Sequence, residues 1–338
     1  MKYVFFEIEQ WQKQPILDAF PHDEIVFTEE FLNINTVDKY ADAEMVSTFI
    51  HSVAPKEVID KLPNLKLIAT RSTGFNHIDY EYAKTKEVYV ANVPFYGENT
   101  VAEHTFALIL ALSRKIFQTY ERTENLDFHR DNIIQGFDLK DKTMGIYGLG
   151  HIGNYVAKIA HGFSMNIIAY KRTPDPELTA KYGVKFVDGI DPILERSDVI
   201  SFHCPLTPDT KHIVNPDNYT KIKKGAILVN TARGGIVSTE ALLKALEEGY
   251  LSGVGLDVFE EELALEDPVA LLDPKFREKH NLTEVIQEHM LVARDDVILT
   301  PHNAYNTVEA VRRILNTSIN NIHRFFAGDS QNIVNPNW

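Results

Sequence analysis

The chain has 338 residues, of which 44% are apolar and 24% are charged, a composition typical of globular proteins. Its length exceeds what one ordinary hydrophobic core needs, so two domains are expected. A formal net charge of −14 disfavours a nucleic-acid partner, because the phosphates would be repelled. An acidic surface that only keeps the protein soluble explains the same charge.

Three features of the sequence predict a cytoplasmic protein with no membrane partner. Cys204 is the only cysteine, which excludes an intramolecular disulfide and favours a reducing compartment. The longest apolar run, from Phe106 to Leu112, is far shorter than the roughly 20 residues that span a bilayer. Glu7 follows the first apolar residues too soon for a signal peptide.

Short apolar segments alternate with helical patterns from the first residues onward, which favours an α/β fold with a parallel sheet. The sequence predicts the first strands at residues 3–6, 44–50, 65–69 and 88–91. It predicts helices between them at residues 15–20 and 56–62.

A longer helix is expected to begin at Thr100. Thr100 and Glu103 have the spacing of a capping box, in which the two side chains satisfy backbone N–H groups at a helix start. From Phe106 to Leu112 the helix is apolar nearly all round, which is typical of burial on most sides. A helix at a domain seam or subunit interface has this pattern, and so does an ordinary core helix.

A second α/β series begins at residue 143. Strands are predicted at residues 143–147, 166–170, 198–202, 226–230, 253–257 and 297–300. Six strands with intervening helices fit a doubly wound sheet. A polar, acidic stretch at 260–296 interrupts the series, with a helical pattern near 282–291. The last helix, 308–326, is expected to pack on the first domain.

The glycine loop, residues 148–153, has the pattern Gly-x-Gly-x-x-Gly between a predicted strand and a helical pattern at 154–160. Gly148 permits a tight turn, Gly150 lets a pyrophosphate approach the backbone, and Gly153 lets the helix pack closely on the strand. The helix N-terminus adds N–H groups and partial positive charge. In this context the loop predicts dinucleotide binding, and a turn with only a structural role is the alternative.

The next predicted strand ends in Tyr170-Lys171-Arg172-Thr173. Sites that prefer NAD usually carry an acidic residue here, which binds the ribose hydroxyls. Two cations and a hydroxyl instead suit a 2′-phosphate, which Arg172 can bind with two hydrogen bonds. The pattern therefore favours NADP(H) over NAD(H). The alternative is that Lys171 and Arg172 are solvated charges at a strand end.

Polar segments also follow the last three predicted strands, at residues 230–235, 255–262 and 300–305. In a doubly wound sheet, ligands bind outside the carboxyl ends of the strands. We therefore expect these three segments to converge near the cofactor.

Over essentially its whole length, the chain resembles the D-isomer-specific 2-hydroxy-acid dehydrogenases, and their D-lactate dehydrogenase branch most. The resemblance is carried by the glycine loop, the three polar segments and residues 71–79, 92–96, 102–104, 197–201 and 203–207. It implies two Rossmann-like, doubly wound α/β domains. A dinucleotide-binding domain, 99–303, would be inserted into a discontinuous, flavodoxin-like substrate domain of residues 1–98 and 304–338.

The resemblance implies hydride transfer between NAD(P)H and a 2-keto acid, which gives an (R)-2-hydroxy acid. Arg233 would hold the substrate carboxylate and polarise the keto oxygen through its planar donors. His302 would protonate this oxygen in reduction and take the proton back in oxidation. Glu262 would orient the imidazole and raise its pKa. Because Glu260 and Glu261 precede it, only the family spacing singles out Glu262.

Further site residues follow from the resemblance alone. The substrate pocket would include the backbone of Thr73 and Gly74, the side chains of Tyr96 and Tyr305, and Phe49 or His51. Asp257 would accept a hydrogen bond from the nicotinamide carboxamide. Other cofactor contacts would come from Gly148, Gly150, His151, Ile152, Gly153, Lys171, Arg172, Thr173, Cys204, Pro205, Thr210, Thr231, Ala232 and Arg233. No metal is expected, because the nicotinamide carries the hydride and no residue grouping has zinc-ligand spacing.

Other functions share these motifs. Reductases of glyoxylate or hydroxypyruvate and phosphoglycerate dehydrogenases are the nearest enzyme alternatives, and a dinucleotide-sensing corepressor is the alternative from another class. The complete set of Arg233, Glu262 and His302 favours an enzyme. By family analogy, the helix that begins at Thr100 and its neighbours would form a homodimer interface.

Overall fold

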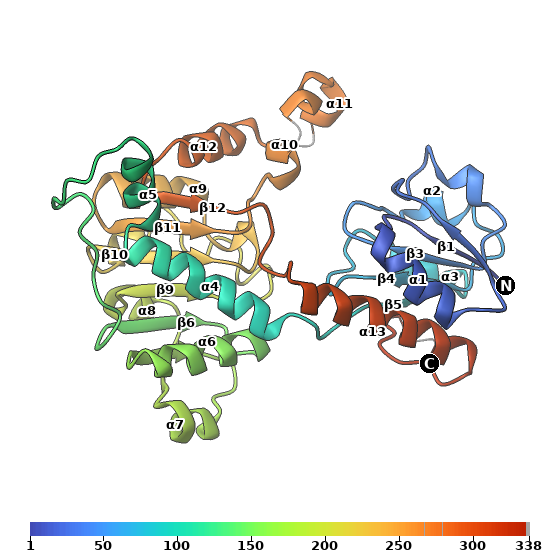
Figure 1. Ribbon diagram of the computed structural model, residues 1–338, viewed down its shortest axis with the longest axis horizontal. Coiled ribbons are helices and arrows are strands. Elements are labelled where there is room, and N and C mark those ends of the chain that lie inside the picture. The colour runs from blue at the N-terminus through green and yellow to red at the C-terminus, as the bar shows by residue number, and fades with distance from the viewer. Residues whose placement is uncertain (267, 279, 336–338) are drawn as a thin grey trace. The chain divides into compact units, whose positions relative to one another are not determined.

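The computed structural model describes residues 1–266, 268–278 and 280–335. It divides into two compact units: Met1–Tyr96 with the described residues of Thr307–Trp338, and Gly97–Asn306 (Figure 1). These divisions lie within three residues of the boundaries predicted at 98/99 and 303/304. Within the described residues, no helix has both the length and the apolar character needed to cross a bilayer.

The first unit is a five-stranded parallel sheet with the order β2-β1-β3-β4-β5, the flavodoxin-like order (Figure 1). Helices cover both faces, so alternate residues of one strand enter different cores. Tyr3 and Phe5 pack with α1 and α13, while Val4 and Phe6 pack with α2 and α3. The elements are β1 Lys2–Phe5, α1 Gln10–Ala19, β2 Glu24–Phe27, η1 Val37–Tyr40, β3 Met45–Thr48, α2 Lys56–Ile59, β4 Leu67–Thr70, α3 Tyr80–Thr85, β5 Tyr89–Ala91 and α13 Val308–Phe326.

The second unit is a seven-stranded parallel sheet with the order β12-β11-β10-β9-β6-β7-β8, which is doubly wound about β6 and β9. α4 and α6 cover one face, and α8, α9 and α12 cover the other. Its first elements are α4 Glu98–Ser113, α5 Ile116–Glu124, β6 Thr143–Tyr147, α6 His151–Gly162, β7 Asn166–Tyr170, α7 Pro176–Tyr182, β8 Lys185–Phe186, α8 Asp191–Arg196, β9 Val199–Phe202 and η2 Tyr219–Lys221. The remaining elements are β10 Ala226–Asn230, η3 Gly234–Ile236, α9 Thr239–Glu247, β11 Leu251–Leu256, α10 Glu262–Glu266, η4 Pro268–Leu272, α11 Pro274–Arg277, α12 Leu282–Val292 and β12 Val297–Leu299.

The fold corrects several details predicted from the sequence. The strands β2 and β8, each at one edge of its sheet, were not predicted. α1 begins at Gln10 rather than at residue 15, and Glu9 and Gln12 form its capping box. α4 begins at Glu98 after Gly97, so Thr100 lies buried inside the helix and the predicted capping box is wrong.

The apolar pattern of α4 is explained by packing inside the second unit. Ala102, Phe106, Ile109 and Leu112 are buried against α6 and the sheet. The core-helix interpretation of this pattern is therefore sufficient for these four residues.

The glycine loop forms the tight connection from β6 to α6. Gly148 has a φ of +100°, and a Cβ atom there would lie 2.6 Å from the carbonyl carbon of His203. A Cβ atom on Gly153 would lie 2.3 Å from the carbonyl oxygen of Gly148. A Cβ atom on Gly150 would meet nothing within 4 Å. Gly148 and Gly153 are thus required by the fold itself, whereas Gly150 leaves open space over the start of the helix.

We expect Gly153→Ala to lower the free energy of unfolding by about 1–3 kcal/mol, because the added carbon meets rigid backbone. Gly162→Ala in the same helix is the matched control, since its Cβ atom would have nothing within 4 Å. Denaturant unfolding of both variants checks this. Equal stability of the two variants would contradict the close packing of α6 on the glycine loop.

Candidate active site

His302 and Glu262 form an ion pair at the carboxyl edge of the seven-stranded sheet. His302 follows β12, Glu262 begins α10, and the distance from His302 Nδ1 to Glu262 Oε1 is 2.7 Å. Their side chains are 41% and 29% exposed, so the pair is accessible. With Nδ1 bonded to the carboxylate, the other ring nitrogen of His302 is the one available for a reacting group.

Three consecutive glutamates precede and begin α10, and each carboxylate has a different histidine partner. Glu260 Oε2 lies 2.5 Å from His212 Nε2, and Glu261 Oε2 lies 2.5 Å from His280 Nδ1. Glu262 pairs with His302. The geometry therefore distinguishes Glu262 from its two neighbours. In the sequence, only the resemblance to the family singled out Glu262 from the three consecutive glutamates.

The pKa of His302 is raised above its usual value of 6.5. The hydrogen bond that His302 donates to the Glu262 carboxylate is the main cause, and the negative charges of Glu262 and Asp257 act in the same direction. Burial and the positive charge of Arg233 oppose the shift. The raised pKa extends the range of pH over which the imidazolium form can donate a proton.

Asp257 fixes the turn on which His302 is carried. Its side chain is 1% exposed. Oδ1 accepts hydrogen bonds from Thr300 Oγ1 at 2.5 Å and Asn303 N at 2.8 Å, and Oδ2 accepts one from Ala304 N at 2.9 Å. The Asp257 carbonyl oxygen accepts a hydrogen bond from His302 N at 2.9 Å. Asp257 was predicted as a cofactor contact, and in this structure its carboxylate organises the 300–304 turn.

Arg233 lies on a loop that Asn230 holds in place. Asn230 Nδ2 donates to the carbonyl oxygen of Arg233 at 2.8 Å, and Ala232 N donates to Asn230 Oδ1 at 3.0 Å. Thr231 Oγ1 is 3.0 Å from Thr105 Oγ1 of α4. The guanidinium is exposed, and its charge acts on the pKa of His302. Arg233 therefore lies close enough to His302 for its charge to act on the imidazole, and the ring of Tyr305 lies 6.5 Å from that of His302.

The predicted cofactor residues follow the ends of neighbouring strands. Gly150 is the N-cap of α6 and brings no capping side chain, so the first amides of a twelve-residue helix fit an anionic pyrophosphate, as do the adjacent His151 and Ile152 positions. Cys204 follows β9, and burial raises the pKa of its thiol to about 11, which makes it a poor nucleophile. Thr210 Oγ1 donates to the carbonyl oxygen of Pro205 at 2.7 Å and so closes the turn after Cys204.

Lys171, Arg172 and Thr173 follow β7, where the adenosine ribose of a dinucleotide would bind. Arg172 and Thr173 are exposed. Lys171 Nζ lies 3.8 Å from Asp175 Oδ2, a distance at which the acid only partly offsets the charge of the lysine.

The remaining predicted substrate residues belong to the first unit. The turn at Thr73 and Gly74 is braced on both sides: Thr73 Oγ1 donates to Val93 O at 2.8 Å, and Ser72 Oγ donates to Gly74 O at 2.6 Å. Arg313 Nε donates to the carbonyl oxygen of Tyr96 at 2.6 Å. Within the described residues, no group of three His, Cys, Asp or Glu side chains is arranged to hold a metal ion.

The sequence analysis did not single out Glu288, which accepts hydrogen bonds from the backbone of Glu260 and Glu261. It is 1% exposed on α12, where Val285 and Leu291 are the other buried residues of its face. The available signal was an acid at three-residue spacing from two apolar residues of a predicted helix, which is also common on solvated faces.

Comparison with known proteins identifies the family of the chain. Residues 106–304 match the family model described as D-isomer specific 2-hydroxyacid dehydrogenase, NAD binding domain. A 2-hydroxyacid dehydrogenase homolog of Zymomonas mobilis is 40% identical over 92% of this chain and 92% of its own. The D-lactate dehydrogenase of Escherichia coli is 32% identical over 98% of both chains. The structure of D-lactate dehydrogenase from Aquifex aeolicus, complexed with NAD and lactic acid, superposes with a TM-score of 0.85 at 33% identity, over 99% of this chain and 100% of that one.

The family match covers more than half of the chain, and the relatives cover nearly all of it. The two Rossmann-like sheets agree with the solved relative over its full length. The fold class and the enzyme class predicted from the sequence are thereby confirmed, and the chain belongs to the D-isomer specific 2-hydroxyacid dehydrogenase family.

Proposed function

We propose that this dehydrogenase interconverts a small 2-keto acid and the corresponding (R)-2-hydroxy acid, in the manner of a D-lactate dehydrogenase. The observation that carries the proposal is the 2.7 Å hydrogen bond between His302 and Glu262, with the charge of Arg233 acting on the same imidazole. Two relatives named D-lactate dehydrogenase, one of them solved with NAD and lactic acid, support this substrate class.

Each residue of the site has a role in this reaction. In reduction, the keto carbon gains a hydride and the keto oxygen gains a proton, so one NAD(P)H and one proton are consumed. Bound nicotinamide supplies the hydride. Arg233 binds the substrate carboxylate and polarises the keto oxygen. His302 donates the proton to this oxygen, and Glu262 stabilises the imidazolium from which it comes.

The remaining assignments complete the proposed pocket. Thr73 and Gly74 bind the carboxylate through backbone N–H groups, and Tyr96 and Tyr305 line the pocket. Asp257 accepts a hydrogen bond from the nicotinamide carboxamide. The dinucleotide contacts Gly148, Gly150, His151, Ile152, Gly153, Cys204, Pro205, Thr210, Thr231 and Ala232. The space over Gly150 supports this arrangement for the pyrophosphate.

We expect His302→Asn to lower kcat for keto-acid reduction by roughly 10²–10⁴-fold, because the proton donor is lost, while the dinucleotide affinity stays within a few fold. Oxidation of NADH and NADPH is followed with pyruvate, glyoxylate and hydroxypyruvate. Wild-type turnover in the variant would remove His302 from the mechanism. If the wild-type protein binds a dinucleotide but reduces none of these keto acids, the result would favour a dinucleotide-sensing corepressor instead.

The same assay has a defined pH dependence. Reduction needs the imidazolium, so kcat/KM for reduction is level below the raised pKa of His302 and falls as pH rises through it; kcat/KM for oxidation rises over the same range. Glu262→Gln removes the main cause of the raised pKa, so both limbs move to lower pH. Limbs that stay in place in this variant would show that another group controls the profile.

We further propose that the enzyme uses NADP(H) more efficiently than NAD(H). The matched NAD binding domain and the NAD-bound relative support NAD(H) as a cofactor. The additional support for NADP(H) comes from Lys171 and Arg172, two cations at the end of β7 where an acid usually binds the ribose. The contact of Lys171 with Asp175 is 3.8 Å long between two partly exposed side chains and is weak, so a phosphate can replace it.

We expect Lys171→Asp with Arg172→Ala to raise the ratio of kcat/KM for NADH over NADPH at least tenfold, because the 2′-phosphate loses its cations and the ribose hydroxyls gain an acceptor. Lys158→Ala, which removes an exposed cation from α6, is the control and leaves the ratio unchanged. An unchanged ratio in the double variant would contradict the NADP(H) preference.

We also propose that the protein forms a homodimer through a patch on α5 and the segment after it. Five apolar side chains of these two elements are 54–81% exposed and define the patch: Phe117, Tyr120, Leu126, Phe128 and Ile133. Exposed apolar clusters of this kind commonly mark association surfaces. A second copy of the chain is the partner that the family analogy favours.

We expect Leu126→Glu with Phe128→Glu to convert the dimer into a monomer, because two charges would be buried in the interface without partners. Leu272→Glu is the control, since this residue is 79% exposed on η4, outside the patch. Light scattering after size-exclusion chromatography gives the mass of each variant. A dimer in the double variant would place the interface elsewhere, and a monomeric wild type would refute the homodimer.

A further inference from the structure

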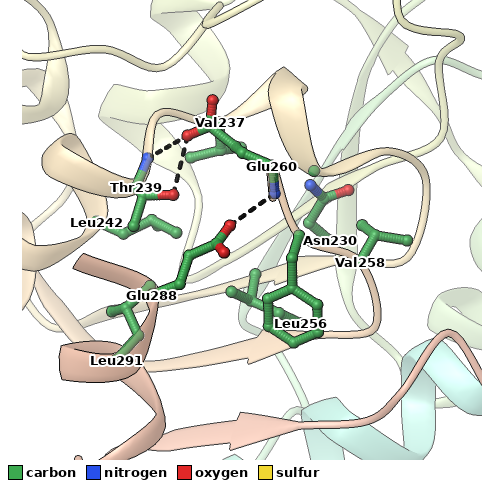
Figure 2. Close-up of a pocket in the computed structure, with 11 residues that line it drawn as sticks. Asn230, Val237, Thr239, Leu242, Leu256, Val258, Glu260, Glu288 and Leu291 are labelled. Atoms are coloured by element: carbon green, nitrogen blue, oxygen red, sulfur yellow. Dashed lines mark hydrogen bonds between the residues drawn. The ribbon is translucent and has the colours of Figure 1, made fainter. Parts of the chain in front are cut away.

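Glu288 contacts the loop that leads directly into Glu262. Its Oε1 accepts hydrogen bonds from two consecutive backbone amides, Glu260 N at 2.7 Å and Glu261 N at 3.1 Å. Figure 2 shows the first of these bonds, with Glu288 reaching from α12 toward the Glu260 backbone. One side-chain oxygen therefore fixes the two residues that immediately precede the proposed partner of His302.

The same loop is held from its other side. The Glu260 carboxylate accepts hydrogen bonds from Thr239 N at 2.8 Å and Thr239 Oγ1 at 2.9 Å, both drawn in Figure 2. A Cβ atom on Gly234, the neighbour of Arg233, would lie 1.9 Å from the carbonyl carbon of Phe259. The loop therefore packs closely on the segment that carries Arg233, and Glu288 binds two of its backbone amides.

Glu288 is an unusual residue for its surroundings. It is 1% exposed, and its Oε2 has no hydrogen-bond partner among the described residues. Burial raises the pKa of its carboxyl to about 7, against the lowering effect of the two backbone amides, and the nearby charges of Glu260 and Glu261 add to the rise. Burial and the charges of Glu260 and Glu261 also raise the pKa of Glu284 on the same helix, and the carboxylates of Glu260 and Glu261 pair with His212 and His280. An apolar residue would avoid this cost of burial, so the acceptor oxygen needs an explanation.

The cavity beside Glu288 is too small to make this cluster a ligand site. Its volume is about 10 Å³, and most of its lining is apolar, including Val237, Leu256 and Leu291. Small-molecule sites are typically of about 300–1,000 Å³. The buried acid therefore acts on the two backbone amides that it binds.

We propose that Glu288 is a positioning residue, which sets the Glu262 carboxylate against His302 by fixing the amides of Glu260 and Glu261. This inference rests on the proposed roles of Glu262 and His302. Because the two amides lie one and two residues before Glu262, their release lets the start of α10 move and lengthens the 2.7 Å bond to His302. Groups that orient a catalytic residue in this way typically contribute 10–100-fold to activity.

The test compares two variants of similar shape. Glu288→Gln keeps an oxygen that accepts both amide hydrogen bonds, whereas Glu288→Met fills the same volume without such an acceptor. We expect the Gln variant to keep kcat within about threefold of the wild type. We expect the Met variant to lose about 10–100-fold in kcat with little change in dinucleotide affinity, and to move the alkaline limb of the reduction profile to lower pH, as Glu262→Gln does.

Glu284→Gln is the matched control, since it changes an acid of the same helix without touching the two amides, and its profile stays that of the wild type. If the Met variant does not fold, Glu288→Asp provides the same comparison, because it withdraws the oxygens by one methylene. A wild-type pH profile in the Met or Asp variant would overturn the proposal. So would a loss of kcat matched by an equal loss of dinucleotide affinity. If Glu262→Gln and His302→Asn also leave the profile unchanged, the proposed function fails; if they change it, only the role of Glu288 is refuted.

Discussion

The geometry at His302 depends on the buried carboxylate of Asp257. His302 has a φ of +47°, a backbone conformation that residues other than glycine rarely adopt. Such a backbone persists only where its surroundings over-determine it. Here both oxygens of Asp257 receive donors from the residues on either side of His302, and the Asp257 carbonyl oxygen binds the His302 amide. The imidazole is therefore directed by the strand end of β11 rather than by its own turn.

A second carboxylate acts in the same way on the other member of the pair. Glu288 holds the amides before Glu262, as Asp257 holds the amides after His302. The two acids come from different segments, since Asp257 directly follows β11 and Glu288 lies in the middle of α12. A hydrogen bond of 2.7 Å between two partly exposed side chains is maintained because each side chain is mounted on backbone that a buried carboxylate has immobilised.

The three consecutive glutamates place like charges close together at the site, and each charge has its own partners. Each carboxylate is directed to a histidine on a different segment, and Glu260 and Glu261 also accept backbone N–H groups, from Thr239 and Asn281. These bonds separate the charges in space and satisfy their oxygens. The arrangement leaves one of the three, Glu262, directed toward His302.

The sequence predicted the long, buried strands well, because β6, β7 and β10 are continuous apolar runs with clear ends, and their residues match the predicted ranges. It missed β2, although Ile25, Val26 and Phe27 are apolar, and it missed β8, because two residues are too few to show a pattern. It placed the start of α4 at Thr100, because the side-chain spacing matched a capping box, although Gly97 provides the actual break. The site residues at strand ends were predictable because parallel strands bring their carboxyl ends to one edge. Residues that act through the backbone, such as Glu288, carry no comparable spacing.

The acidic stretch at 260–296 contains Glu288, a residue that acts through the backbone. By charge it resembles a solvated insertion, yet its helix α12 buries Val285, Glu288 and Leu291 against the sheet face that α9 also covers. The two apolar residues anchor α12, and this anchoring makes the position of the acid between them reproducible. A surface insertion would not tolerate a fully buried carboxyl, because its desolvation would exceed the stability of a loosely packed helix. The presence of Glu288 at this depth therefore implies that α12 is part of the structural support of the site, and that the stretch supplies an element on which the Glu262–His302 pair depends.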